Sequence, residues 1–384
     1  MKKTFYRSLS ILLIFTFLFM PLINAQELEL TAKSALLVVA ETGQILYSKE
    51  AEQRQAPASI TKVMTMYLTM EALDEERISL DDIVTVSTRA WEIGESSMFL
   101  NQGDRVSVHQ LLQGMSIVSG NDAAISLAEH IAGSVEEFVK MMNAKAQELG
   151  LTNSHFANPH GLDADKHYMS AADMALLCTN LYNNYPEVIE YYSQKEFTYA
   201  GISQESRNPL LGRVKGVDGI KTGFTDDAGY SVVISGVKND IRVIAVLLGT
   251  ESEEIRSTES SEFFDYAYTH FDLDQIVDKN EELGEIPVLQ GKENAIAYRA
   301  QEDFSLLIKS DESDQIEIYN ILLEEIKAPI EAGQVLGSME VGYNGQKLKV
   351  IPLIASKDVP KANIFKIIWQ FILGFFQKAI RTIK

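Results

Sequence analysis

The strongest constraint in this sequence is a short polar segment that leads directly into an apolar helix. Pro57 disfavours helical backbone at the residue before it, so we expect the helix to begin after it, near Ser59. Residues 60–73 are apolar on nearly all sides, which is typical of a buried helix. Ser59 and Lys62 are three residues apart, so their side chains should lie on one face of this helix, one turn from each other.

A serine and a lysine in this arrangement can form a catalytic pair. A serine hydroxyl is a poor nucleophile until a base removes its proton. A lysine can act as that base when its amine is neutral, which burial and a nearby positive charge favour. The spacing alone is not specific, because Ser235 and Lys238 share it in a strand-like run, where such residues point to opposite faces. A helix N-cap beside a solvated lysine is the alternative for Ser59 and Lys62.

Both ends of the chain differ in composition from its body. Residues 1–25 combine a basic start with an apolar run and end on the small residue Ala25, which indicates a secretory signal peptide, with a retained membrane anchor as the alternative. Residues 361–384 are apolar, with polar or basic positions about one turn apart. This tail predicts an amphipathic helix that attaches the protein to the outer face of the cytoplasmic membrane, and a transmembrane span is the alternative.

The charge distribution also separates the ends from the body. The formal net charge is −20, yet both ends are basic and contain no acidic residue. Without the eight basic residues of the ends, the remaining 54 acidic and 26 basic residues give −28. An acidic body argues against nucleic-acid binding, whereas a basic tail is attracted to a negatively charged surface such as a membrane. The single cysteine, Cys178, lies in an apolar helical run, so we predict a core residue and neither a disulfide framework nor a thiolate metal site.

The order of the predicted elements indicates an α/β (α+β) domain at 26–272. Strand hairpins stand near both ends of this region and helices lie between them, so the sheet should collect its strands from both ends. Trp91 to Ser97 is expected to be a polar loop. The expected elements are a hairpin at 34–49, a short strand at 83–86, helices at 107–118, 123–132, 134–150 and from 170, a second hairpin at 230–248, and a helix at 253–271. Ser134 and Glu137 are expected to form a capping box at the start of the helix at 134–150.

Residues 273–360 have a different pattern. Asn344-Gly345 is a strong signal for a hairpin turn. The apolar runs of this region are short and β-like, and they lie at 286–289, 295–298, 305–308, 316–321 and 347–353. We expect a small β-sandwich-like domain that carries no chemistry of its own. The tail helix at 361–384 would follow it.

Two further motifs follow Ser59 and Lys62 in the chain. Ser119-Gly120-Asn121 lies between two predicted helices, and Lys221-Thr222-Gly223 precedes the second hairpin. Each motif also has a purely structural interpretation. Ser119-Gly120-Asn121 could be a helix-to-helix turn, and Lys221-Thr222-Gly223 could be an exposed strand end. All three motifs in this order, behind a signal peptide, form a specific pattern.

The sequence resembles the penicillin-recognising serine enzymes. Within them it is most similar to the low-molecular-mass penicillin-binding proteins that are D-alanyl-D-alanine carboxypeptidases. The resemblance covers residues 30–355 and the tail, and the small β-domain belongs to it. Besides the three motifs, it rests on Asn158-Pro159-His160-Gly161-Leu162, Gly219-Ile220 and Gly249-Thr250 before Arg256.

This resemblance implies a transpeptidase-like catalytic domain and a role for each motif residue. Ser59 would attack the carbonyl of the penultimate D-alanine and form an acyl-ester, and Lys62 would take its proton. Ser119 would pass a proton to the departing amine. Lys221 and Thr222 would bind the substrate carboxylate, and Lys221 would help to keep Lys62 neutral because two close ammonium groups resist both being charged.

The resemblance also implies the surroundings of the reacting carbonyl. Asn121 would hold Lys62 or the substrate amide, and Gly223 would let the substrate lie along its strand. The backbone amides of Ser59 and Phe224 would form the oxyanion hole. Phe224 is a departure, because some relatives carry a histidine there. The expected substrate is a peptidoglycan pentapeptide and the expected inhibitors are β-lactams; neither a metal nor a cofactor is implied.

Other interpretations are weighed against this one. A class A β-lactamase needs a glutamate in a middle loop, and residues 151–169 contain none. A D,D-endopeptidase that cuts peptidoglycan crosslinks would use the same residues and stays open. A non-catalytic wall-binding module would be expected to lack a motif residue. A metalloprotease would need a His-Glu-x-x-His motif and a Ser-His-Asp hydrolase a Gly-x-Ser-x-Gly motif, and the sequence has neither.

Overall fold

The computed structural model describes residues 28–238, 240–309 and 312–368. The predicted signal peptide and residues 369–384 of the predicted tail helix lie outside the described residues. Within the described ranges, no helix combines the length and apolar character needed to cross a membrane.

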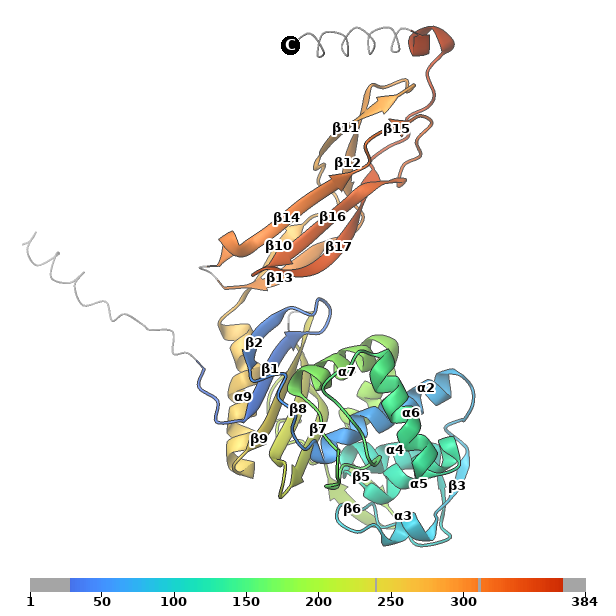
Figure 1. Cartoon of the computed structure of the whole chain (residues 1–384), viewed down its shortest axis with the longest axis vertical. Helices are drawn as coiled ribbons and strands as arrows, with labels where there is room; N and C mark the ends of the chain where they lie inside the picture. Colours follow the sequence, from blue (N-terminus) through green and yellow to red (C-terminus); the bar gives the residue numbers. More distant parts are fainter. Residues whose placement is uncertain (1–27, 239, 310–311, 369–384) are drawn as a thin grey trace, which may run out of the picture. The chain divides into compact units, whose positions relative to one another are not determined.

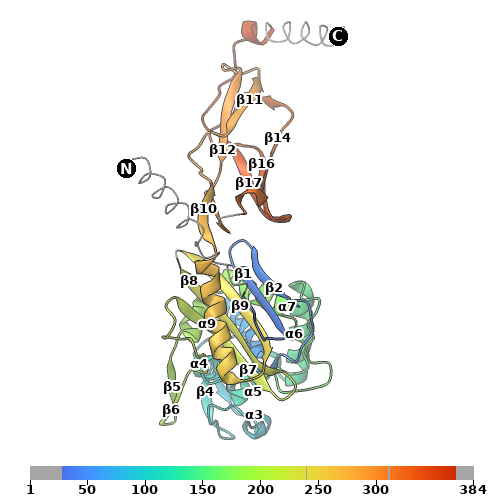
Figure 2. The same cartoon turned by 90° about the vertical axis from the view of Figure 1, so that its left-hand side faces the viewer.

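The catalytic region is built on a five-stranded antiparallel sheet whose strands come from both ends of this region, as predicted. The strand order is β2-β1-β9-β8-β7, so β1, in the hairpin near the start of the domain, pairs with β9, which comes some 200 residues later. Helix α9 (Glu253–Thr269) packs on one face of the sheet, and α7 (Ala171–Asn184) on the other (Figures 1 and 2). The strands are β1 (Ser34–Val39), β2 (Ile45–Lys49), β7 (Val217–Thr225), β8 (Gly229–Lys238) and β9 (Ile241–Thr250).

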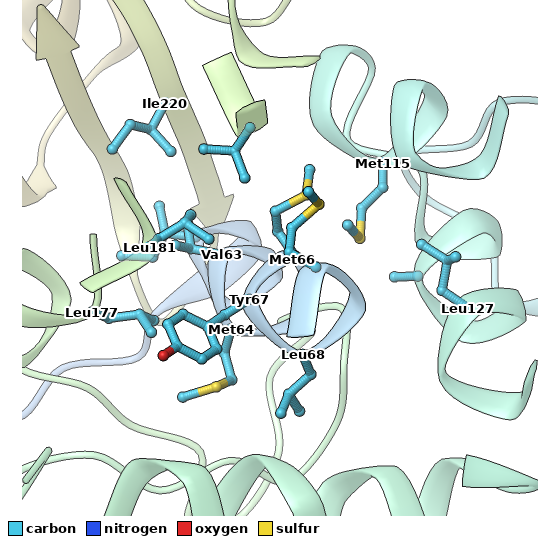
Figure 3. Packing of buried hydrophobic residues seen from close by; sticks show 14 of the residues in the cluster. Val63, Met64, Met66, Tyr67, Leu68, Met115, Leu127, Leu177, Leu181 and Ile220 are labelled. Carbon is cyan, nitrogen blue, oxygen red and sulfur yellow. The ribbon is translucent and has the colours of Figure 1, made fainter. Parts of the chain in front are cut away.

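The helical part surrounds α2 (Lys62–Asp74), which follows a single 3₁₀ turn, η1 (Ala58–Thr61). Figure 3 shows apolar side chains of α2, such as Met66 and Leu68, enclosed by residues from other elements, among them Met115 and Leu127. Because α2 is apolar all round, it can be buried on every side, and this fixes the residues at its start. Its helical neighbours are α4 (Val108–Ile117), α5 (Asn121–Ala132), α6 (Val135–Glu148) and α7.

Three sequence expectations for this part need correction. Helix α5 begins at Asn121, two residues before the predicted start, so Asn121 lies in its first turn. Ser134 accepts a hydrogen bond from the Glu137 amide, but the Glu137 carboxylate pairs with Lys140, so the reciprocal half of the expected capping box is missing. Trp91 belongs to a short helix, α3 (Thr88–Glu92), because the Ser87 side chain caps it.

Several short elements escaped the sequence patterns. Each has few residues, so it shows too little periodicity to detect. Cys178 is fully buried in the core, as expected. The short strand β3 (Ile83–Thr85) was predicted, at 83–86, and is confirmed. The short elements that were missed are β4 (Arg105–Ser107), η2 (Pro186–Val188), α8 (Ile189–Tyr192), β5 (Glu196–Tyr199) and β6 (Ile202–Glu205).

The C-terminal region is all-β, as predicted. It contains a six-stranded sheet of order β14-β16-β17-β12-β11-β15 and a separate pair, β10 with β13, around an apolar core of its own. Asn344 and Gly345 form the β16–β17 turn with positive φ angles of 51° and 74°, as their sequence indicated. The elements are β10 (Asp272–Val277), β11 (Gly284–Leu289), β12 (Ala295–Ala300), β13 (Phe304–Ile308), η3 (Ser313–Gln315), β14 (Ile316–Leu322), β15 (Ile326–Lys327), β16 (Val335–Tyr343) and β17 (Gln346–Ala355).

Candidate active site

Ser59 and Lys62 meet at the junction of η1 and α2. The Lys62 Nζ lies 3.0 Å from Ser59 Oγ, and the lysine side chain is 1% exposed. The residue before Ser59, Ala58, has a left-handed φ of 48°, a strained conformation of the kind that is found at functional sites. The other pair with this spacing does not meet, because Ser235 is buried and hydrogen-bonds Arg242 while Lys238 is exposed on β8.

Burial is the main reason why the pKa of Lys62 lies well below its usual value. The nearby Lys221 ammonium lowers this pKa further, whereas the Asp122 carboxylate raises it. A buried lysine next to a second positive charge favours the neutral amine. Lys62 is therefore prepared to act as a base and not as a fixed cation.

Asn121 connects the first turn of α5 to this lysine. Its Oδ1 accepts a hydrogen bond of 2.7 Å from Lys62 Nζ, and its Nδ2 donates to the carbonyl of Gly94 at 3.1 Å. A carbonyl can only accept, so the Gly94 contact fixes which end of the amide faces the lysine. Asn121 therefore presents only a hydrogen-bond acceptor to Lys62. The asparagine amide cannot replace the lysine as a base.

Ser119 lies in the turn between α4 and α5 with a left-handed φ of 65°. Its side chain is buried, and its Oγ has no hydrogen-bond partner within the described part of the chain. A buried hydroxyl without a hydrogen-bond partner destabilises the folded state unless a ligand or solvent supplies that partner. Ser119 lines the same cleft as Ser59, so a bound substrate can supply that partner.

A turn at 158–161 contacts the start of α2 at this site. The His160 carbonyl accepts a hydrogen bond of 2.6 Å from Lys62 Nζ, and the Pro159 carbonyl accepts one from Thr65 of α2. Gly161 has a φ of 95°, and a Cβ there would lie 1.8 Å from the carbonyl oxygen of Ala58. This turn therefore needs glycine both for its backbone angle and for its close approach to η1.

Strand β7 brings the third motif to the site. Lys221 is 2% exposed, its Nζ donates to the Thr222 carbonyl at 3.1 Å, and burial followed by the charges of Arg207 and Arg256 lowers its pKa to about 7. A Cβ on Gly223 would lie 3.1 Å from the backbone nitrogen of Ser59. Glycine is needed here because a side chain would cover the amide of the serine.

A cleft of about 1380 Å³ opens above these residues. Arg256 reaches it from α9, with Nη2 2.8 Å from the Glu253 carboxylate, while its Nε has no partner within the described ranges. Phe224 stacks on Tyr230 with ring centroids 4.3 Å apart. The cleft lining includes Ser59, Ser119, Arg207, Thr222, Phe224 and Arg256.

Sequence reasoning missed two contributors. Arg207 belongs to a second Ser-x-Asn segment, Ser206-Arg207-Asn208, that lies in the cleft wall and influences Lys221. The sequence feature that could have revealed this segment is its Ser-x-Asn pattern, which it shares with the second motif. The His160 carbonyl was also missed, because a backbone acceptor has no side-chain signature. In the described ranges no group of three or more His, Cys, Asp or Glu residues is arranged to hold a metal ion.

Comparisons with known proteins agree with this geometry. A family model described as D-alanyl-D-alanine carboxypeptidase matches residues 22–252, and one described as penicillin-binding protein 5, C-terminal domain, matches 271–361. The D-alanyl-D-alanine carboxypeptidase DacF of Bacillus subtilis is 38% identical over 352 residues, which cover 88% of this chain and 89% of the relative.

Solved structures give the same result. Penicillin-binding protein 5 from Haemophilus influenzae superimposes with a TM-score of 0.75 at 35% identity, covering 87% of this chain and 98% of that one. Penicillin-binding protein D2 from Listeria monocytogenes in the ampicillin-bound form has a TM-score of 0.59 at 32% identity, covering 63% of this chain and 99% of that one. With the match over 22–252 and the serine–lysine pair at the centre of the cleft, the chain belongs to the D-alanyl-D-alanine carboxypeptidase family and is a serine-type hydrolase.

Proposed function

We propose that this carboxypeptidase removes the terminal D-alanine from peptidoglycan stem peptides through an acyl-ester on Ser59. The observation that carries the proposal is the position of the Lys62 amine, 3.0 Å from Ser59 Oγ, in surroundings that favour its neutral form. The chemistry needs a nucleophile, a base and a site for the substrate carboxylate. The cleft offers candidates for all three.

The hydrogen bonds of Lys62 explain how it would act as the base. A neutral amine has two N–H donors and one lone pair. Asn121 Oδ1 and the His160 carbonyl can only accept, so they take the two N–H groups, at 2.7 and 2.6 Å. The lone pair then remains for the Ser59 hydroxyl, whose proton it takes as the oxygen attacks the substrate carbonyl carbon.

The oxyanion of the tetrahedral intermediate would be held by the backbone amides of Ser59 and Phe224. Gly223 leaves the Ser59 amide uncovered, because a Cβ at this position would lie 3.1 Å from its nitrogen. The amide of Phe224 does not depend on the identity of its side chain. The replacement of the histidine of some relatives by Phe224 would therefore leave this function intact.

Departure of D-alanine requires a proton for its amine and a site for its carboxylate. Ser119, whose buried Oγ has no partner within the described part of the chain, would transfer the proton from Lys62 to the leaving amine. Lys221 and Thr222 of β7 would bind the carboxylate. Arg207 and Arg256, which line the cleft together with Thr222, would assist them. Lys62, neutral again, would then activate the water that hydrolyses the acyl-ester.

β-Lactams would inhibit this enzyme by acylating Ser59, since they resemble the D-alanyl-D-alanine end of the substrate. The ampicillin-bound form of the Listeria monocytogenes relative supports this part of the proposal. The absence of a glutamate from residues 151–169 favours a slowly hydrolysed acyl-enzyme and not a β-lactamase.

We also propose where the enzyme works. Residues 1–25 would direct secretion, and the amphipathic tail at 361–384 would hold the protein on the outer face of the cytoplasmic membrane. The β-domain at 273–360 would act as a spacer between the membrane and the catalytic domain at 26–272. Deletion of residues 361–384 should release an active, soluble enzyme, and loss of activity on a small peptide would contradict the separate role of the tail.

The central experiment measures D-alanine release from a peptide that ends in Lys-D-Ala-D-Ala. We expect release that a β-lactam blocks, and we expect Ser59→Ala to lose both release and covalent penicillin labelling. Ser48→Ala, at an exposed serine of β2 that does not line the cleft, is the matched control and should retain both. Labelling that persists in Ser59→Ala would mean that another serine is the nucleophile. Labelling without D-alanine release in the unmodified enzyme would favour crosslink hydrolysis, the endopeptidase alternative.

A further inference from the structure

Strand β7 contains a β-bulge shortly before the third motif. Val217 pairs with Gly236 of β8, but the next pair joins Gly219 to Ser235. Asp218 is therefore an extra residue on the β7 side, and the pairing is regular from there to the end of the strand. A bulge of this kind shifts the register of all the residues that follow it by one position.

The bulge decides which way Lys221 faces. Residues two apart on a strand share a face, so Lys221 points to the same side as the Gly223 position. A Cβ on Gly223 would lie 3.1 Å from the Ser59 nitrogen, so this side is the one that meets η1. Without the extra residue, the pairing would slip by one position, and Lys221 would point to the opposite face of the sheet, away from Ser59.

An ion pair holds the bulge in place. The Arg242 guanidinium reaches from β9 across β8 and lies 2.8 Å from a carboxylate oxygen of Asp218, and it also donates to Ser235 Oγ on β8. Its carbon atom lies 4.3 Å from the centre of the Tyr182 ring of α7. Both charged side chains are mostly buried, with exposed fractions of 13% for Arg242 and 20% for Asp218. Arg242 therefore connects three adjacent strands and a helix at the extra residue.

The place of this ion pair indicates its role. Removing two charges from water costs free energy that their attraction only partly returns, so a mostly buried pair is weak evidence for stability. Buried polar or charged groups can instead select one of several possible registers. This pair lies where the register between β7 and β8 changes. Selection of the register is the role that fits this place.

We propose that Asp218 and Arg242 are positioning residues, whose ion pair fixes the bulge that turns Lys221 toward Ser59. The proposal rests on the proposed role of Lys221 in binding the substrate carboxylate. Neither Asp218 nor Arg242 belongs to the lining of the cleft, so both act through the strand and not by contact with the substrate. Loss of the pair should therefore weaken recognition of the carboxylate more than it weakens the attack by Ser59.

The test compares acylation of the full-length protein by benzylpenicillin and by its methyl ester. The ratio of the two rate constants measures how strongly the enzyme prefers a free carboxylate. We expect this preference to fall about tenfold in Lys221→Ala, the usual effect of one hydrogen bond to a charged group. Asp218→Ala should lower it about three- to tenfold, because Lys221 is then no longer held toward Ser59.

Glu71→Ala is the matched control. Glu71 of α2 forms a similarly buried ion pair of 2.7 Å with Lys145 of α6, and the exposed fractions of the two side chains are 17% and 11%. This variant also loses a mostly buried pair, but the pair does not touch β7. The preference should stay unchanged. An equal loss of preference in Glu71→Ala would show that any damaged ion pair has this effect, and the proposal would be wrong.

A double variant separates positioning from general damage. Asp218→Ala added to Lys221→Ala should cause no further loss of preference, because the group that it positions is already absent. Damage to the fold would instead lower both rate constants by one factor and leave their ratio intact. Asp218→Asn, which keeps one acceptor for Arg242, gives a milder form of the same measurement if Asp218→Ala does not fold.

Failure of this inference differs from failure of the proposed function. Full preference in a folded Asp218 variant, together with reduced preference in Lys221→Ala, would overturn the inference alone. Unchanged preference in Lys221→Ala would contradict the proposed role of Lys221 and the inference with it.

Discussion

The Lys62 amine donates a hydrogen bond of 2.6 Å to the backbone carbonyl of His160, a residue 98 positions later in the chain. This bond joins the start of α2 to the turn at 158–161, and Gly161 is what permits the approach. A backbone carbonyl accepts and never donates, so it orients the amine without competing for the serine proton. The turn is therefore part of the catalytic geometry.

The first prediction concerns Gly161. In Gly161→Ala, the new Cβ would be placed 1.8 Å from the Ala58 carbonyl oxygen, so the turn must move away from η1 and release Lys62. We expect loss of β-lactam acylation and a decrease in the free energy of unfolding of about 2 kcal/mol or more. Urea unfolding and penicillin labelling measure the two effects.

Gly150→Ala is the matched control for this prediction. Gly150 also has a positive φ, 77°, but no atom lies within 4 Å of the position of its Cβ. This variant should show the backbone cost alone, about 1 kcal/mol, and normal labelling. Equal behaviour of the two variants would mean that the contact between the turn and η1 has no special importance.

The second prediction concerns Gly223. A Cβ at this position would lie 3.1 Å from the Ser59 nitrogen, which is proposed to donate to the oxyanion. Removal of one oxyanion donor typically slows catalysis about 10²-fold or more. We expect Gly223→Ala to lower kcat for D-alanine release by about this factor while the melting temperature changes little. An unaffected kcat would remove the Ser59 amide from the oxyanion hole.

The third prediction is a pH shift in Asn121→Asp. A carboxylate in place of the amide would accept from Lys62 at a similar distance and stabilise the ammonium, so the pKa of Lys62 should rise. The acid limb of the acylation profile should move to higher pH, and acylation at pH 7 should fall about tenfold. Raising the pH should recover the rate. A uniform loss at all pH values would instead indicate damage to the contact with Gly94.

The sequence predicted the parts of this site that depend on local periodicity. Ser59 and Lys62 lie at the start of a predicted buried helix, and on a helix their spacing places the two side chains on one face. Ser119 and Lys221 belong to distant segments, and their place in the same site followed from a resemblance to a known family. Their proximity depends on how α5 packs against α2 and how β7 packs against η1, which no local pattern encodes.

Other features were not accessible from the sequence for identifiable reasons. The His160 carbonyl is a backbone group, and every residue has one. Arg207 lies in an irregular loop, and its influence on Lys221 arises from tertiary packing. Strand β16 was overlooked because Gly337 and Gly342 interrupt its apolar pattern. The early start of α5 at Asn121 follows from the packing of its first turn, where Asp122 binds the loop at 97–100.

The last prediction concerns acid stability and rests on His167. Burial lowers the pKa of His167 to about 4, and the ring is held between two partners: its Nδ1 accepts from the Ala157 amide, and its Nε2 lies 2.8 Å from the Thr61 hydroxyl. Because Nδ1 accepts, the neutral ring carries its proton on Nε2 and donates to Thr61. This arrangement serves the neutral ring, and protonation of Nδ1 would break the bond from Ala157.

The sign of the pH effect follows from the proton balance. Between pH 6.5, the usual pKa of histidine, and about 4, the unfolded chain binds a proton at His167 that the folded protein does not. Stability should therefore decrease as the pH falls through this window, by up to about 1.4 kcal/mol per pH unit for this residue. Urea unfolding at pH 7 and pH 5 measures the decrease, and His167→Asn, which keeps an acceptor for Ala157 but cannot be protonated, should reduce it by about 2 kcal/mol. An identical decrease in the variant would show that His167 does not drive the acid sensitivity.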